Sequence, residues 1–197
     1  VKGVTLAPAN RPITIRHLLT HTAGISYGTD PAIAPQYRAA GLGPAAGYGW
    51  YTADKDEPIC ETMDRLGTLP FVSQPGAAFV YGYSTDVLGC VVERIAEMSL
   101  DQFFRTRIFE PLGMDDTYFF LPPEKAARLT AVHQIDSAGG LGLAPEGARG
   151  QGHYLVGPRK SYSGGAGLVS TAGDYGRFLQ MLLGGGILEG QRLLSPA

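Results

Sequence analysis

Residues 84–96 constrain the fold most, because apolar residues recur there at the spacing of one helix face. The apolar positions are Val87, Leu88, Val91, Val92 and Ile95. A stripe of this kind predicts a helix that packs against a core. Ser84 stands where an N-cap side chain accepts a free backbone N–H. One such helix needs other elements that bury the same face, so the chain is expected to form a layered domain.

Four further stretches carry helical signals. Thr14 is placed to cap a short helix that Gly24 would end, and residues 59–66 form another apolar face. Ser99 and Gln102 form a capping-box pattern before a helix that Pro111-Leu112-Gly113 is expected to end. Its expected core face is Leu100, Phe103, Phe104 and Ile108. Ser170-Thr171 is placed to cap a final helix, whose expected apolar face is Tyr175, Phe178, Leu179 and Leu182.

The stretches between these helices contain few convincing strands. Residues 28–56 are rich in Gly, Pro, Ala and Tyr without a clear period, and residues 138–152 are glycine-rich. The first is expected to form a long loop or a loosely helical excursion, and the second a surface loop. No stretch alternates strand with helix as a parallel α/β sheet requires, and the sequence has no internal repeat.

Composition excludes several classes of protein. The 197 residues are 44% hydrophobic and 17% charged, with a net charge of −2, which suits one well-packed domain. The sequence has no basic stripe that would predict binding to nucleic acid or to an anionic membrane. No apolar run approaches the length of a membrane span.

The two cysteines lack metal-ligand spacing, and Cys90 lies within an apolar helical pattern. We therefore expect Cys90 to be a buried free thiol.

Residues 24–28, Gly-Ile-Ser-Tyr-Gly, match the G-x-S-x-G pattern of hydrolase nucleophiles. A nucleophile elbow needs a strand before the serine and a helix after it. Here a predicted helix precedes Ser26, and no clear helix follows. We therefore expect Ser26 to lie in a turn after a helix, with Gly24 as the residue that ends that helix, and not to act as a nucleophile.

Three segments together resemble the serine β-lactamase-like and penicillin-binding-protein-like superfamily. They are "PITIRHLLTHTAGISYG", "PFVSQPGAAFVYGYSTDVLGCVVERIAEMSLDQFFRTRIFEPLGMDDTYF" and "GGAGLVSTAGDYGRFLQMLLGGG". The resemblance implies an α+β fold of the serine β-lactamase/DD-peptidase type. Residues 1–197 would then be the interior portion of a single domain. This portion would be mostly the helical region, without the flanking segments that build most of the antiparallel sheet.

The resemblance also implies a set of catalytic motifs. In this superfamily a serine in S-x-x-K is acylated, its lysine helps to remove the serine proton, and a tyrosine in Y-x-N lies beside both. This sequence contains no S-x-x-K, and residues 52–55, Thr-Ala-Asp-Lys, are only its nearest imitation. The nucleophile and its lysine are therefore expected upstream of residue 1. The third family motif, K-T-G or a variant, is expected beyond Ala197.

The middle motif is present in altered form as Tyr83-Ser84-Thr85. By resemblance, Tyr83 is the catalytic base or proton shuttle and Thr85 contacts the substrate. Without the resemblance, Tyr83 would be interpreted as an aromatic residue packed at a helix entrance. Threonine in place of the family's asparagine favours the carboxylesterase members, represented by the family VIII enzymes, over the β-lactamases.

Other polar positions are interpreted more simply. Gly165, in the glycine-rich turn 163–167, is a candidate substrate-lining residue, although a plain turn explains it equally well. His21 is expected to be structural and to hydrogen bond with local backbone. Asp115 and Asp116 are expected to form a solvated turn rather than a carboxylate dyad.

The function expected from the resemblance is that of a serine carboxylesterase that cleaves short acyl esters through an acyl-enzyme, without a metal or cofactor. A β-lactamase, a D-amino-acid peptidase or carboxypeptidase, and a non-catalytic binding or sensor domain of the same fold remain alternatives. The expected partner is a small ester or amide. Without the nucleophile, the 197-residue chain alone is expected to be inactive. The sequence leaves compartment and oligomeric state open.

Overall fold

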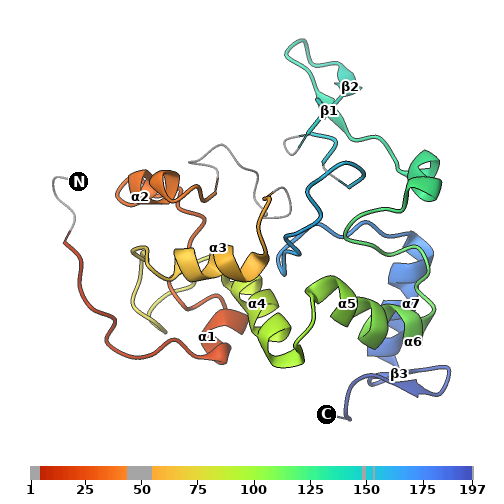
Figure 1. The fold of residues 1–197 in the computed structure, drawn as a ribbon, viewed down its shortest axis with the longest axis horizontal. Coiled ribbons are helices and arrows are strands. Elements are labelled where there is room, and N and C mark those ends of the chain that lie inside the picture. The colour runs from red at the N-terminus through yellow and green to blue at the C-terminus, as the bar shows by residue number, and fades with distance from the viewer. Residues whose placement is uncertain (1–4, 44–54, 148–149, 153, 197) are drawn as a thin grey trace.

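The computed structural model describes residues 5–43, 55–147, 150–152 and 154–196, and these residues form a mostly helical structure (Figure 1). In the first half, α1 spans Ile15–Leu19, α2 Ala34–Ala39, α3 Ile59–Leu66 and α4 Ser84–Ala96. In the second half, α5 (Leu100–Phe104), the π-helical turn η2 (Arg105–Phe109) and α6 (Glu110–Leu112) follow one another, and a 3-10 turn, η3, spans Pro123–Arg128. The last helix, α7, spans Ala172–Leu183.

Two small antiparallel hairpins contain the strands named in the described residues. β1 (His133–Ile135) pairs with β2 (Leu141–Leu143), so that Gln134 lies opposite Gly142. β3 (Ile187–Leu188) pairs with β4 (Gln191–Arg192) after α7. The second strand of the first hairpin, β2, lies within the glycine-rich stretch 138–152 that was expected to be a surface loop, and the hairpin is largely exposed. Within the stretch 28–56, α2 forms, and residues 44–54 lie outside the described residues.

Two hydrophobic clusters hold the chain together. The first joins α1, α3 and α4 through buried residues that include Leu18, Ile59, Leu66 and Cys90. The second joins η2, α6 and α7 through Phe109, Leu112, Met114 and Met181. Figure 1 shows α1–α4 in one half of the molecule and α5–α7 in the other, with α4 leading directly into α5.

The predicted helix at residues 84–96 is present as α4, and Val87 and Leu88 of its predicted face pack against the first cluster, but its start and the far end of that face differ from the prediction. Tyr83 is the N-cap and makes no side-chain capping hydrogen bond, while Ser84 is already helical. Ile95, assigned to the core face, is 79% exposed, whereas Gly89 and Cys90 are buried. The glycine-rich loop around Gly164 packs against Gly89, and this contact orients the helix.

Helix α1 begins as predicted and ends earlier. The Thr14 hydroxyl accepts a hydrogen bond from the His17 backbone N–H, and the His17 side chain accepts one from Thr14, which completes a capping box. The helix ends at Leu19 rather than near Gly24. His21, with φ of 53°, is the left-handed residue that follows the end of the helix, and Gly24, which was expected to end it, also has a positive φ of 81°.

The helices of the second half confirm the predicted N-caps but not every predicted face. The Ser99 hydroxyl caps α5, and the Thr171 hydroxyl caps α7. The stretch expected as one helix from Leu100 onward changes to π geometry at Arg105, and Gly113 ends it as predicted. On α7, Met181 is buried while Tyr175, Leu179 and Leu182 are exposed. The second cluster meets α7 on the side of Met181, which periodicity alone does not select.

The free-thiol prediction for Cys90 is wrong, because Cys60 and Cys90 form a disulfide that joins α3 to α4. The two cysteines are 30 residues apart in the sequence. Cys90 is buried as expected, but packing of α3 against α4 brings Cys60 to it. Their spacing in the sequence did not reveal this pairing.

Reduction of the disulfide is expected to destabilise the full-length protein. A cross-link that closes a loop of about 30 residues contributes on the order of 3–4 kcal/mol in the chain-entropy model. Urea unfolding with and without a phosphine reductant measures this difference. The Cys60→Ser/Cys90→Ser variant serves as the control, because the reductant should not change its unfolding curve. Two free thiols in the unreduced, denatured protein would contradict the disulfide.

Candidate active site

Tyr83 lies in the core at the start of α4. Its side chain is 1% exposed, and its ring meets the edge of the Tyr27 ring at a centroid distance of 4.8 Å. The hydroxyl lies so close to Gly43 that a Cβ at Gly43 would come within 2.9 Å of it. The structure therefore places this predicted catalytic tyrosine within packed side chains and backbone.

Tyr81, two residues earlier, has the opposite environment. It is 62% exposed, and its ring packs against His21 at 4.9 Å and Tyr27 at 5.7 Å. Gly82 separates the two tyrosines, and a Cβ there would lie 2.4 Å from the Ile25 carbonyl oxygen. This close backbone contact fixes the turn that leaves one tyrosine exposed and the other buried.

Tyr27 connects the two tyrosines to the first turn of α4. Burial raises the pKa of the Tyr27 phenol well above its usual value, and the nearby Asp86 carboxylate and Tyr81 raise it further. The Tyr27 phenol is therefore neutral across the physiological range. Its ring lies between buried Tyr83 and exposed Tyr81 and contacts both.

Asp86 fixes the glycine-rich loop against α4. One of its carboxylate oxygens accepts a hydrogen bond from the Ser163 hydroxyl, and both side chains are buried. The Ser163 oxygen in turn accepts the backbone N–H groups of Gly165 at 3.0 Å and Ala166 at 3.1 Å. Two buried side chains thus set the conformation of an exposed loop.

The loop brings two of the predicted substrate-binding residues together. A Cβ at Gly165 would lie 3.0 Å from both the Thr85 hydroxyl and an Asp86 carboxylate oxygen. Gly165 is exposed and Thr85 is half-buried. The structure therefore places Thr85 and Gly165 side by side at the N-terminal end of α4, close to the turn that carries Tyr81 and Tyr83.

The buried Asp86 carboxyl is expected to make the free energy of unfolding depend on pH. Burial raises its pKa to about 6, although the hydrogen bond from Ser163 opposes the shift. The unfolded value is about 3.9, so the folded state retains its proton to higher pH. The free energy of unfolding is expected to fall by on the order of 3 kcal/mol as the pH rises from about 4 to about 6.

Asp86→Asn keeps an oxygen that can accept the Ser163 hydrogen bond and removes the titration. Urea unfolding of the full-length protein at several pH values from 4 to 7 should show the decline in the parent. The variant should lack that contribution to the slope. An identical slope in both proteins would contradict the assignment to Asp86.

Ser26 does not lie in the helix C-terminal turn predicted for it, because α1 ends at Leu19, seven residues earlier. The Ser26 side chain is buried, and its oxygen accepts the Gly28 backbone N–H at 3.1 Å. Residues 20–25 form no strand before it, so the context is not that of a nucleophile elbow. Of the imitation of S-x-x-K, residues 52–54 lie outside the described residues, and Lys55 is buried with its ammonium group 2.6 Å from the Gly41 carbonyl oxygen.

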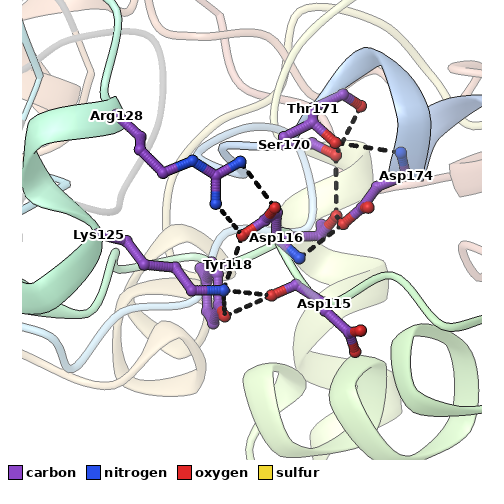
Figure 2. Close-up of polar contacts among 9 residues, drawn as sticks. Asp115, Asp116, Tyr118, Lys125, Arg128, Ser170, Thr171 and Asp174 are labelled. Carbon is purple, nitrogen blue, oxygen red and sulfur yellow. Dashed lines mark hydrogen bonds and ion pairs between the residues drawn. The ribbon is translucent and has the colours of Figure 1, made fainter.

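The Asp115-Asp116 turn is more structured than predicted. Figure 2 shows the Asp116 carboxylate between Arg128 and Lys125, at 2.6 and 2.7 Å. These two cations, Arg128 foremost, lower the pKa of the Asp116 carboxyl. The Asp116 backbone N–H donates to buried Asp174 at 2.8 Å. The aspartate pair is thus neither a dyad nor a simple solvated turn, because it ties η3 to the start of α7.

Two negative findings concern the described part of the chain. It contains no group of three His, Cys, Asp or Glu side chains arranged to hold a metal ion. No helix within it is both long and apolar enough to cross a bilayer.

Sequence reasoning missed Tyr81, Asp86 and Ser163. Tyr81 had a signal, since two tyrosines flank Gly82 and either could be the motif tyrosine. Asp86 and Ser163 gave little signal, because their contact spans 77 residues. His21 also departs from its prediction, since its buried Nδ1 has no hydrogen-bond partner among the described residues.

Comparison with known proteins supplies the family. The β-lactamase family model matches residues 4–197. Protein Rv1367c of Mycobacterium tuberculosis and the lovastatin esterase of Penicillium rubens are 37% and 36% identical to the chain, each over 193 residues. Each alignment covers 96% of this chain and 43% of the relative.

Among solved structures, EstCE1, described as a hydrolase with promiscuous acyltransferase activity, superposes with a TM-score of 0.72 at 27% identity. The match covers 92% of this chain and 48% of EstCE1, so the chain spans less than half the length of these relatives. The chain belongs to the β-lactamase family, within the serine β-lactamase and penicillin-binding-protein-like superfamily, and has the β-lactamase/DD-peptidase fold.

Proposed function

We propose that residues 1–197 form the interior portion of a single domain in a serine esterase that cleaves short acyl esters through an acyl-enzyme. The esterase and hydrolase names of the relatives support ester chemistry over β-lactam chemistry. The altered motif supports it too, because neither choice of motif tyrosine places an asparagine at the third position. If Tyr83 begins the motif, the third position is Thr85, and if Tyr81 begins it, the third position is Tyr83.

We further propose Tyr81, rather than Tyr83, as the tyrosine that takes part in proton transfer. The contrast in exposure between the two tyrosines carries this proposal. A proton-transferring hydroxyl must come within hydrogen-bond distance of the reacting groups. Tyr81 is accessible for this purpose, whereas packing encloses Tyr83, and additional chain around the site would bury Tyr83 further.

The proposed cycle has two steps. The serine of an S-x-x-K motif, supplied by a segment upstream of residue 1, attacks the ester carbonyl while its proton passes toward Lys and Tyr81. The proton then reaches the leaving alcohol as the carbon–oxygen bond breaks, which leaves an acyl-serine. In the second step water attacks the acyl-serine carbonyl, its proton passes through the same groups to the serine oxygen as the serine–acyl bond breaks, and the acid is released. Thr85 and Gly165 are proposed to line the substrate cleft beside Tyr81.

Labelling with a fluorophosphonate probe tests this function. The full-length gene product is treated with the probe, digested, and mapped by mass spectrometry. An adduct on a serine of an S-x-x-K motif outside residues 1–197, with hydrolysis of p-nitrophenyl butyrate, supports the proposal. An adduct on Ser26 would contradict it.

Two other outcomes correspond to the alternative functions. Absence of any adduct, together with absence of turnover, would indicate a non-catalytic binding or sensor domain. Turnover of nitrocefin in preference to the ester would indicate a β-lactamase. A preparation of residues 1–197 alone should neither be labelled nor hydrolyse the ester, and activity in that preparation would contradict the upstream nucleophile.

A further inference from the structure

We propose that His21 is a positioning residue whose imidazole ring holds the Tyr81 side chain in its reactive orientation. The inference rests on the proposed function of Tyr81 and extends it to a residue that the sequence pattern assigned to local backbone bonding. Three observations support it: the backbone conformation of His21, the position of its ring, and the state of its Nδ1 atom.

The His21 backbone is held in an uncommon conformation directly beside the tyrosine segment. Its φ of 53° lies in the left-handed region, which few residues other than glycine adopt without cost. Its carbonyl oxygen accepts the backbone N–H of Val80 at 2.7 Å, one residue before Tyr81. Its own N–H donates to the Leu18 carbonyl oxygen at 3.2 Å, which ties it to α1. The left-handed turn therefore directs this residue toward the segment that carries Tyr81.

The imidazole ring lies against two exposed aromatic side chains. Its centroid is 4.9 Å from that of Tyr81 and 5.7 Å from that of Phe79, and both contacts are tilted. Phe79 and Tyr81 are largely exposed, whereas His21 is half-buried. His21 thus gives the exposed phenol of Tyr81 a partly buried surface to pack on.

The two histidines of this region differ in a way that separates their roles. His17 Nδ1 accepts the Thr14 backbone N–H at 3.2 Å, and this bond caps α1. His21 Nδ1 is buried and lacks any such partner among the described residues. A local hydrogen bond therefore explains the role of the His17 ring, whereas the contacts found for the His21 ring are those with Phe79 and Tyr81.

Positioning of this kind affects rate more than binding. A displacement of about 1 Å in a group that transfers a proton costs on the order of 100-fold in rate. The Tyr81 side chain emerges from a turn and is mostly exposed, so it depends on its neighbours for a fixed orientation. Loss of the His21 ring should widen the range of Tyr81 orientations and leave the substrate contacts unchanged.

His21→Asn tests the ring separately from the backbone, because asparagine adopts the left-handed conformation more readily than most residues. In the full-length protein, we expect kcat for p-nitrophenyl butyrate to fall by about 10- to 100-fold. KM should stay within about twofold, because the loss acts on the reactive orientation rather than on substrate binding. His17→Asn is the matched control, since it should lower the melting temperature through loss of the capping box and leave kcat unchanged.

A double-mutant cycle with Tyr81→Phe identifies the route of the effect. If His21 acts through Tyr81, His21→Asn should cause no further loss of kcat in the Tyr81→Phe background. An equal loss in both backgrounds would overturn the proposal, because the ring would then act independently of Tyr81. An unchanged kcat in His21→Asn alone would also overturn it.

The cycle separates failure of this proposal from failure of the proposed function. If Tyr81→Phe is inactive and His21→Asn is fully active, the positioning role fails and the role of Tyr81 stands. If Tyr81→Phe is fully active, the role of Tyr81 fails, and the positioning role fails with it.

Discussion

Tyr81→Phe in the full-length protein is expected to lower kcat/KM for p-nitrophenyl butyrate by about 100- to 10,000-fold, the range typical of a group that transfers protons. The substitution removes one hydroxyl and keeps the ring that packs against His21 and Tyr27. The free energy of unfolding should therefore change little, because the side chain is mostly exposed. Steady-state kinetics and urea unfolding on the same preparation measure both quantities.

Tyr83→Phe is the matched control, since it removes the same atom two residues away. Its hydroxyl lies in the packed core beside Gly43, so the expected cost is a loss of stability of about 1 kcal/mol. Its kcat/KM should stay within about threefold of the parent. The reverse pattern, with an inactive Tyr83→Phe and an active Tyr81→Phe, would return the catalytic role to Tyr83.

Gly164→Ala is expected to disrupt both the packing of the glycine-rich loop on α4 and the activity. A Cβ at Gly164 would lie 2.1 Å from the Thr85 carbonyl oxygen and 3.1 Å from the Gly89 nitrogen, both backbone atoms of α4. Backbone cannot move aside as a flexible side chain does, so the loop must separate from the helix. We expect a loss of about 1–3 kcal/mol in the free energy of unfolding, together with a large loss of kcat/KM, because Thr85 and Gly165 would separate.

Gly176→Ala provides the control for the same chemical change. Gly176 lies inside α7, and a Cβ there would meet no atom within 4 Å. Alanine favours a helix interior over glycine by about 0.5–1 kcal/mol, so this variant should be slightly more stable and fully active. Chemical unfolding of both variants beside the parent makes the comparison. Equal effects in the two variants would contradict the close backbone contact at Gly164.

The predictable features of this fold are those that depend on neighbours in the sequence. A capping hydroxyl acts on a backbone N–H two or three residues away, so Thr14, Ser99 and Thr171 were identified correctly. The family resemblance added the overall fold. Which face of a helix is buried depends on segments far away, and for this reason Ile95 and the outer face of α7 were assigned to the core incorrectly.

The same distinction between local and distant contacts applies to the candidate site. Thr85 and Gly165 were each predicted to line the substrate site, and the structure places them side by side. The choice between Tyr81 and Tyr83 depends on how Gly82 packs against the Ile25–Ser26 backbone, which no local pattern encodes. The Cys60–Cys90 pairing likewise depends on how α3 meets α4.

The network in Figure 2 has a consequence for the way the second half of the molecule opens. Asp116 holds η3 through Arg128, and its backbone holds Asp174 in the first turn of α7. Native proteins open locally in cooperative units, and we expect segments joined in this way to belong to one such unit. Amides of η3 and of the first turn of α7 should therefore share one opening free energy in native-state exchange, although more than 40 residues separate them in the sequence. The exposed hairpin β1–β2 between them should exchange earlier.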